Sequence, residues 1–274
     1  MFRIVLILIS TFFACQTPES NPVENTTTLN TIDSNETPEI LQVDLDSAEI
    51  DTNHHQLRLS PLDQSYSQVK REIAKKQAAF LTTYSKHKDS THKDSIITQA
   101  ADYLTETLVN QIIPYWYGTT WDFSGYTDKP NDGMIGCSYF VSTTLLHAGF
   151  NINRYKLAQQ GPLSEAKSLQ LQDTVLRLDG LDNLYNTVLD NHSDGLFFIG
   201  LDHYHVGYLL KRQGEVFFLQ SSYDESMAVI IEKAMHSGIL ESYSTFWLVP
   251  ITAQKALIEA WILKKSITVV KGKE

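Results

Sequence analysis

The second half of the chain contains short apolar segments separated by turns, and this pattern constrains the fold most. The segments have the length and the residue types of β-strands, and the tripeptide Arg212-Gln213-Gly214 is typical of a turn between two of them. We predict strands at 196–199, 204–210, 215–220, 227–231 and 245–249. Strands that follow one another so closely form a meander, so we expect a small antiparallel sheet.

The residues before these strands show the spacing of helices, with apolar side chains every three or four positions. We predict helices at 66–86, 95–112, 163–178, 181–189 and 252–264. Pro114 ends the second helix, and Gln77 interrupts the apolar face of the first. Helices followed by meandering strands indicate an α+β fold class, and residues 61–274 are enough for one domain with a substantial core.

The segment Met134–Gly149 places Cys137 at the start of a short apolar helix that ends near Gly149. Unpaired N–H groups in the first turn of a helix favour a thiolate, which is the nucleophile that acyl transfer requires. The alternative is that Cys137 is a small buried apolar residue, which is the common fate of a free cysteine.

The N-terminus has the features of an export signal. Arg3 is followed by an apolar run at 4–13 that is too short to span a bilayer stably. Cys15, directly after Phe-Phe-Ala, resembles the lipidated cysteine of a bacterial lipoprotein signal, so 1–14 would be removed. A plain signal peptide and an uncleaved anchor are the alternatives. With Cys15 lipidated, Cys137 is the one remaining thiol and a candidate reactive cysteine.

Lipidation of Cys15 gives a direct prediction. Cys15→Ser should abolish the incorporation of labelled fatty acid, because the acylated side chain is lost. Labelling that persists in this variant contradicts the assignment.

Residues 15–60 have the composition of an acidic, disordered tether. From Gln16 to Ser60 there are nine acidic residues and one basic residue, which accounts for most of the net charge of −10. Such a segment cannot bury enough apolar surface to fold, and its charges keep it extended. His54 and His55 lack partners at metal-ligand spacing, and no basic stripe suggests nucleic acid.

Two histidines in the predicted strand 204–210 and just before it are candidate bases. His203 and His205 are two residues apart, so both would point to one face of a strand. An imidazole suits proton transfer from a thiol to a leaving amine. A His-x-His pair can also bind a metal, but Asp202 would point to the opposite face and no third ligand follows at short spacing. A structural histidine is the other alternative.

Aromatic residues are dense between Tyr115 and Tyr126, including Trp116, Trp121 and Phe123. Such a group forms either a packing cluster or the wall of a cleft, and the pattern leaves both open.

Four short motifs, in this order along the chain, resemble the NlpC-type family of papain-like cell-wall endopeptidases. They are Tyr117-Gly118-Thr119, Cys137-Ser138 with Phe140-Val141, His205-Val206-Gly207-Tyr208 and Gln220-Ser221-Ser222. The segment 194–198 also resembles the strand that precedes the family's histidine. The resemblance covers roughly 114–222.

The resemblance implies a papain-like fold with extra N-terminal helices and a cysteine-bearing helix packed on the sheet. It also implies that Cys137 is the nucleophile, His205 the base, Gln220 the orienting residue and Tyr117 a neighbour of the attacked carbonyl. We expect a substrate cleft that includes Trp116, Trp121, Ser138 and His203. The implied protein is a monomeric hydrolase of amide bonds in peptidoglycan peptides, without a cofactor or a metal, anchored by lipid in the cell envelope.

The sequence departs from the family at two positions. The family's Asp-Cys-Ser-Gly is Gly136-Cys137-Ser138-Tyr139 here, and the usual third histidine is Gln220, whose carbonyl oxygen can still accept from imidazole. An amidase or acyltransferase on another substrate is one alternative. A catalytically silent wall- or partner-binding lipoprotein that uses Trp116, Trp121 and Phe123 is another. An enzyme with this pair should hold its thiol pKa below the usual value near 8.5.

Overall fold

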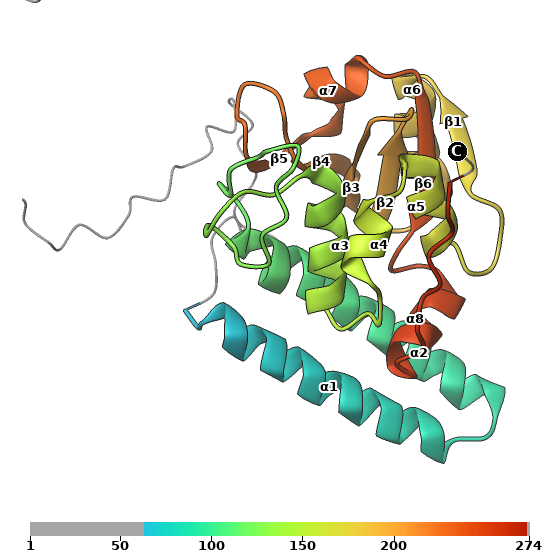
Figure 1. Cartoon of the computed structure of the whole chain (residues 1–274). Helices are drawn as coiled ribbons and strands as arrows, with labels where there is room; N and C mark the ends of the chain where they lie inside the picture. Colours follow the sequence, from blue (N-terminus) through green and yellow to red (C-terminus); the bar gives the residue numbers. More distant parts are fainter. Residues whose placement is uncertain (1–62, 273–274) are drawn as a thin grey trace, which may run out of the picture. The chain divides into compact units, whose positions relative to one another are not determined.

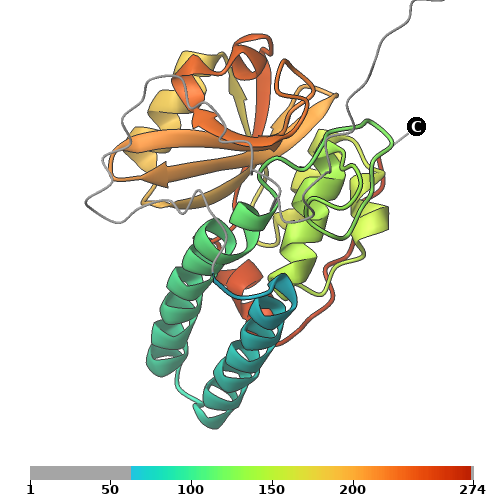
Figure 2. The same ribbon diagram turned by 90° about the vertical axis from the view of Figure 1, so that its left-hand side faces the viewer.

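The computed structural model describes residues 63–272. It contains one antiparallel sheet with helices on both faces, so the predicted α+β class is confirmed (Figures 1 and 2). The signal segment 1–14, Cys15 and the tether up to residue 60 lie outside the described residues. Among those described, no helix combines the length and the apolar composition needed to cross a membrane.

The sheet has six strands in the order β1-β6-β2-β3-β4-β5, and every neighbouring pair is antiparallel. The strands are β1 (Leu176–Asp179), β2 (Gly195–Leu201), β3 (His205–Arg212), β4 (Glu215–Ser221), β5 (Val229–Lys233) and β6 (Thr245–Pro250). Strands β2 to β4 form the predicted meander. Every residue of β2 is buried, because neighbouring strands and both helical layers cover it.

The short helices Arg154–Ala158 and Gly238–Glu241 were not predicted, and most of the other helices differ from their predicted ranges at their ends. They are α1 (Tyr66–Lys86), α2 (Ser90–Thr107), α3 (Cys137–His147), α4 (Arg154–Ala158), α5 (Pro162–Leu169), α6 (Leu181–Asn191), α7 (Gly238–Glu241) and α8 (Lys255–Ile262). Helix α2 begins earlier than predicted because the Asp89 side chain caps it by accepting from the N–H of His92. A π-helical turn at Leu108–Ile112 then leads into Pro114.

Two apolar cores lie on the two faces of the sheet. Alternation along β3 separates them: Tyr208 and Leu210 belong to the core that includes α3, and Leu209 belongs to the core that includes α6. The Tyr208 hydroxyl bonds with the Thr144 hydroxyl at 2.8 Å and donates to the carbonyl oxygen of Val141 at 3.0 Å. These buried bonds fix α3 against β3, which sets the position of the helix start.

The hairpin of α1 and α2 packs against α8 below the sheet in the view of Figure 1. Gln77, the polar residue in the apolar face of α1, is buried at this contact. Its Nε2 donates to the carbonyl oxygens of Gly149 and Trp261 at 2.9 and 2.8 Å. The polar residue that interrupts the apolar face of α1 therefore links this helix by hydrogen bonds to the end of the α3 segment and to α8.

The predicted helix at 163–178 is wrong in its second half. Helix α5 ends at Leu169, and the chain returns as strand β1, which pairs with β6. Leu178 is opposite Phe246, and both lie in the second core. The segment is extended because it pairs with β6 at the edge of the sheet. Only one residue of this short strand is buried, so its sequence shows no alternation of apolar and polar residues.

Candidate active site

A cleft of about 690 Å³ lies where the start of α3 meets the β2–β3 turn and the connection from α4 to α5. Cys137, Ser138, His203 and His205 all line it. Its aromatic lining residues are Trp121, Phe123, Tyr139, Tyr204, Tyr223 and Tyr243. No Asp, Glu, Lys or Arg is among the residues that line this cleft. It is therefore a neutral, aromatic-walled site with a thiol and an imidazole in it.

Cys137 is the first residue of α3, as predicted. The residue before it, Gly136, is extended and packs so closely that a Cβ would lie 3.2 Å from the carbonyl oxygens of Asp122 and Phe123. The backbone N–H groups of Val206 and Ser138 lie close to the Cys137 sulfur and favour its thiolate. Because Val206 follows His205 directly, this contact brings the thiol to the start of the histidine strand.

The pKa of Cys137 is raised, which is opposite to the direction expected from its place at a helix start. Burial of the thiol is the largest cause, and it outweighs the N–H groups of Val206 and Ser138, which favour the thiolate. The Ser138 hydroxyl also favours the thiolate. At neutral pH the resting group is therefore a thiol.

His205 belongs to a chain of buried hydrogen bonds. Its Nε2 lies 2.7 Å from Oε1 of Gln220, the amide Nε2 of Gln220 donates to Oε1 of Glu232 at 2.7 Å, and the Ser237 hydroxyl donates to the same oxygen at 2.8 Å. A carboxylate only accepts, which orients the amide with its oxygen toward the histidine. The proton of neutral His205 is then on Nε2, and Nδ1 has a free lone pair.

The imidazole of His205 is neutral at physiological pH. Burial lowers its pKa to about 4, against the opposing effects of the hydrogen bond to Gln220 and the charge of Glu232. The rings of Phe218 and Tyr223 contact the imidazole edge-on, with centroids at 6.2 and 5.2 Å. These contacts and the Gln220 bond hold the ring in one orientation.

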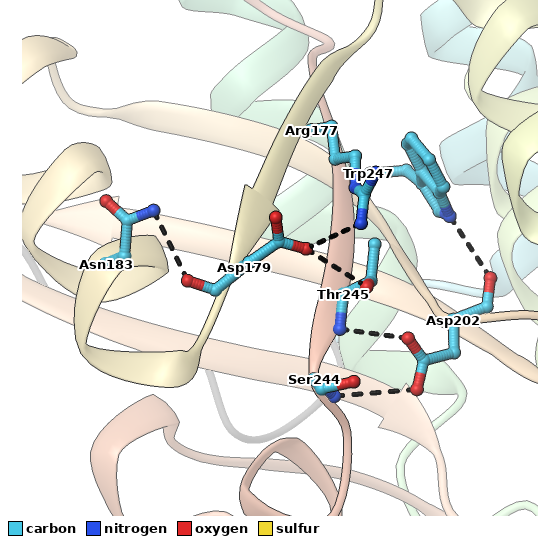
Figure 3. Close-up of polar contacts among 7 residues, drawn as sticks. All are labelled: Arg177, Asp179, Asn183, Asp202, Ser244, Thr245 and Trp247. Carbon is cyan, nitrogen blue, oxygen red and sulfur yellow. Dashed lines mark hydrogen bonds and ion pairs between the residues drawn. The ribbon is translucent and has the colours of Figure 1, made fainter.

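His203 lies in the turn between β2 and β3, so the expectation that both histidines share a strand face is wrong. The turn is exposed at His203 and Tyr204, and Asp202 has a positive φ of 43°. Figure 3 shows how β6 holds the turn: the Asp202 carboxylate accepts from the backbone N–H of Thr245 at 2.9 Å, and the Trp247 indole donates to the Asp202 carbonyl oxygen at 3.1 Å. The anchored turn places His203 at the cleft rim and His205 inside.

The predicted aromatic residues divide between the core and the cleft. Trp121 and Phe123 line the cleft, whereas Trp116 is buried and donates to the Tyr66 hydroxyl at 2.9 Å. Tyr117 is also buried, its hydroxyl has no hydrogen-bond partner among residues 63–272, and it is not among the cleft lining. Neither Trp116 nor Tyr117 therefore belongs to the lining that Cys137 shares.

Sequence reasoning missed two acidic residues next to the predicted site. Glu232, on β5, lies diagonally across from Gln220, whose direct partner in the strand pair is Ile230. Glu165, on α5, bonds with Ser138. Glu232 has no signal in the sequence, because its place beside Gln220 follows from the register of β4 and β5. Glu165 has no signal, because it lies in the insert outside every motif.

One group of side chains in the described part of the chain has the composition of a metal site. His87, Asp89 and His92 offer ligand atoms that lie within 4.8 Å of one another at the connection from α1 to α2. Asp89 already caps α2 and bonds with His92 at 2.7 Å, and the group is largely exposed. It belongs to a different part of the molecule from the cleft lining.

Comparisons of this chain with protein-family models, with curated proteins and with solved structures find no match.

Proposed function

We propose that residues 61–274 form a papain-like domain that hydrolyses amide bonds with Cys137 as its nucleophile. One observation carries the proposal: Cys137, at the start of α3, lines the same cleft as His205, whose ring is oriented by Gln220 at 2.7 Å. A helix-borne thiol, a base on a strand and an amide behind the base are the parts that this chemistry needs. The cleft gives a substrate access to the thiol and the imidazole.

The resting thiol and the neutral imidazole favour general-base catalysis. Nδ1 of His205 takes the proton as the Cys137 sulfur attacks the carbonyl carbon, and the imidazolium then gives that proton to the leaving amine. Backbone N–H groups at the start of α3 stabilise the oxyanion. Water, activated by the same imidazole, hydrolyses the thioester and returns the thiol.

A peptide of peptidoglycan is the first substrate class that we propose, on the strength of the four ordered motifs. The same resemblance and the Ala14-Cys15 signal support a protein held by lipid at a membrane outside the cytoplasm. A monomer acting alone on cell-wall peptide needs no cofactor for this chemistry.

The neutral cleft favours a second candidate, an amidase or acyltransferase that acts on an uncharged substrate. The family's aspartate is replaced by Gly136, and no acidic or basic side chain lines the cleft. Without such a side chain, a charged substrate end has no ion-pair partner there. Aromatic walls instead suit apolar or weakly polar groups.

Two probes test the function on the full mature chain. Purified peptidoglycan should release peptide fragments that mass spectrometry can weigh, and p-nitrophenyl acetate should release a burst of nitrophenol as the acyl-enzyme forms. Fragments from peptidoglycan support the first candidate, and a burst on the ester without fragments supports the second. Neither signal, together with retention of the chain on peptidoglycan, would favour the wall-binding alternative.

A further inference from the structure

Glu165 is a fully buried carboxyl group beside the proposed nucleophile, and the reaction above does not use it. Its Oε1 lies 2.5 Å from Oγ of Ser138, and its Oε2 has no hydrogen-bond partner among the described residues. Burial raises the pKa of Glu165 well above its usual range, and the nearby Cys137 acts in the same direction.

None of the ion pairs within residues 63–272 includes Glu165. Helix α5 packs against α4, β2 and β6, and neither strand carries a titratable side chain. On α4, Arg154 instead binds Thr143 and the carbonyl oxygen of Tyr126, and Lys156 is exposed.

Tyr208 on β3 also interacts with Glu165 and is neutral, because burial raises its pKa, and Lys167 on α5 is exposed. Lys271 lies exposed in the C-terminal segment, in which the N–H of Val270 donates to the hydroxyl of Ser168 on α5. An ionised Glu165 would therefore leave a charged oxygen buried without a partner. A neutral carboxyl group with its proton on Oε1 leaves only a carbonyl oxygen without one.

Ser138 bonds with Glu165 and follows Cys137 directly in the chain, and its hydroxyl has a single hydrogen to share between them. If Glu165 is ionised, the Ser138 hydroxyl donates its hydrogen bond to the carboxylate, and the negative charge of Glu165 disfavours the thiolate of Cys137. If the carboxyl group is neutral, it donates to Oγ of Ser138, and the hydroxyl hydrogen is free for the sulfur. The hydroxyl is already among the groups that favour the thiolate of Cys137.

We propose that Glu165 is a positioning residue: its protonated carboxyl group donates to Oγ of Ser138 and thereby directs the Ser138 hydroxyl hydrogen to the sulfur of Cys137. No covalent bond changes in this relay. It stabilises the thiolate that forms when His205 takes the proton, because aligned hydrogen bonds polarise one another in a buried site. The inference rests on the proposed function, since it requires Cys137 to be the nucleophile.

The pH dependence of Cys137 alkylation tests the relay. Iodoacetamide labelling of the full chain is followed from pH 6 to 10 by mass spectrometry of the Cys137 peptide. Glu165→Gln should keep the wild-type midpoint, because an amide is neutral and still donates to Ser138. Ser138→Ala should raise the midpoint by about one pH unit, which is about tenfold less thiolate at a fixed pH. Glu165→Met, which cannot donate, should raise it as well.

Ser168→Ala is the matched control. Ser168 is buried on the same helix as Glu165, and its hydroxyl bonds with the backbone of Ser164 and Val270 and not with Ser138 or Cys137. It should leave the midpoint unchanged even if the melting temperature falls. A midpoint that falls in Glu165→Gln would show that the native carboxyl group is ionised and would overturn the relay. Wild-type midpoints in both Ser138→Ala and Glu165→Met would also overturn it. A native Cys137 that is unreactive at every pH would instead contradict the proposed function.

Discussion

Cys137→Ala is expected to reduce hydrolysis of peptidoglycan or of p-nitrophenyl acetate by at least about a thousandfold. The variant removes the sulfur that attacks the carbonyl carbon, and the cleft lining offers no second cysteine. Its fold should persist, because the site is half-buried and an alanine favours the first turn of α3. Initial rates with the enzyme in excess over the substrate measure the loss of hydrolysis, and the thermal melting curve measures whether the fold persists.

Ser142→Ala is the matched control for this variant. Ser142 is buried on the same helix, its hydroxyl donates only to the carbonyl oxygen of Tyr139 at 3.4 Å, and it does not line the cleft. It removes one heavy atom, as Cys137→Ala does, so an equal loss of rate in both variants would point to damage to α3. A Cys137→Ala protein with wild-type rates would place the nucleophile elsewhere.

The strands of the sheet could be predicted because their residues alternate or run apolar between recognisable turns. Strand β3 was predicted to begin at Tyr204 and begins at His205, because the anchored Asp202 turn takes up the residues before it. Strand β1 could not be predicted, since one buried leucine at a sheet edge carries no period. Its conformation depends on β6, which follows it by more than sixty residues.

Site residues that belong to a sequence motif could be predicted, and those that tertiary packing brings to the site could not. Cys137, His205 and Gln220 follow the motifs, and His205 and Gln220 bond as expected. Glu232 becomes part of the chain only through diagonal pairing of β5 with β4. Glu165 becomes a neighbour of the thiol only because α5 packs on the same face of the sheet as α3.

The pKa of the thiol shows the same division. The helix start that favours a thiolate is a local feature and can be seen in the sequence at Gly136-Cys137. The burial that raises the pKa comes from tertiary packing: Cys137 packs on the first core, and Pro162 of α5 and His205 of β3 line the same cleft. Local electrostatics could be predicted, and desolvation could not.

His205→Ala is expected to reduce hydrolysis by about a hundredfold to ten-thousandfold, because it removes the general base. Gln220→Ala should cost less, about tenfold, since Gln220 only orients the ring through one hydrogen bond. His203→Ala should have the mildest effect of the three, because His203 is exposed in the turn at the rim. A larger loss of hydrolysis in His203→Ala than in His205→Ala would show that His203, and not His205, is the general base.

The pH dependence of kcat/KM of the wild-type protein should reflect the lowered pKa of the buried base, His205. An imidazole accepts a proton only when neutral, and burial lowers the pKa of His205 to about 4. The acid limb of kcat/KM should therefore fall near pH 4 rather than near the ordinary histidine value of about 6.5. A limb near 6.5 would mean that His205 is charged where the proposed mechanism needs it neutral.

Unfolding must be measured over the same pH range, because the same shift affects stability. The folded pKa of His205 is lower than the unfolded value, so the unfolded chain binds the extra proton, and the free energy of unfolding falls as the pH drops from about 6.5 towards 4. His147, whose pKa burial also lowers to about 4, adds to this loss. His147→Gln should therefore flatten the stability curve while leaving the acid limb of kcat/KM in place. That separation would assign the limb to the base in the cleft rather than to acid unfolding.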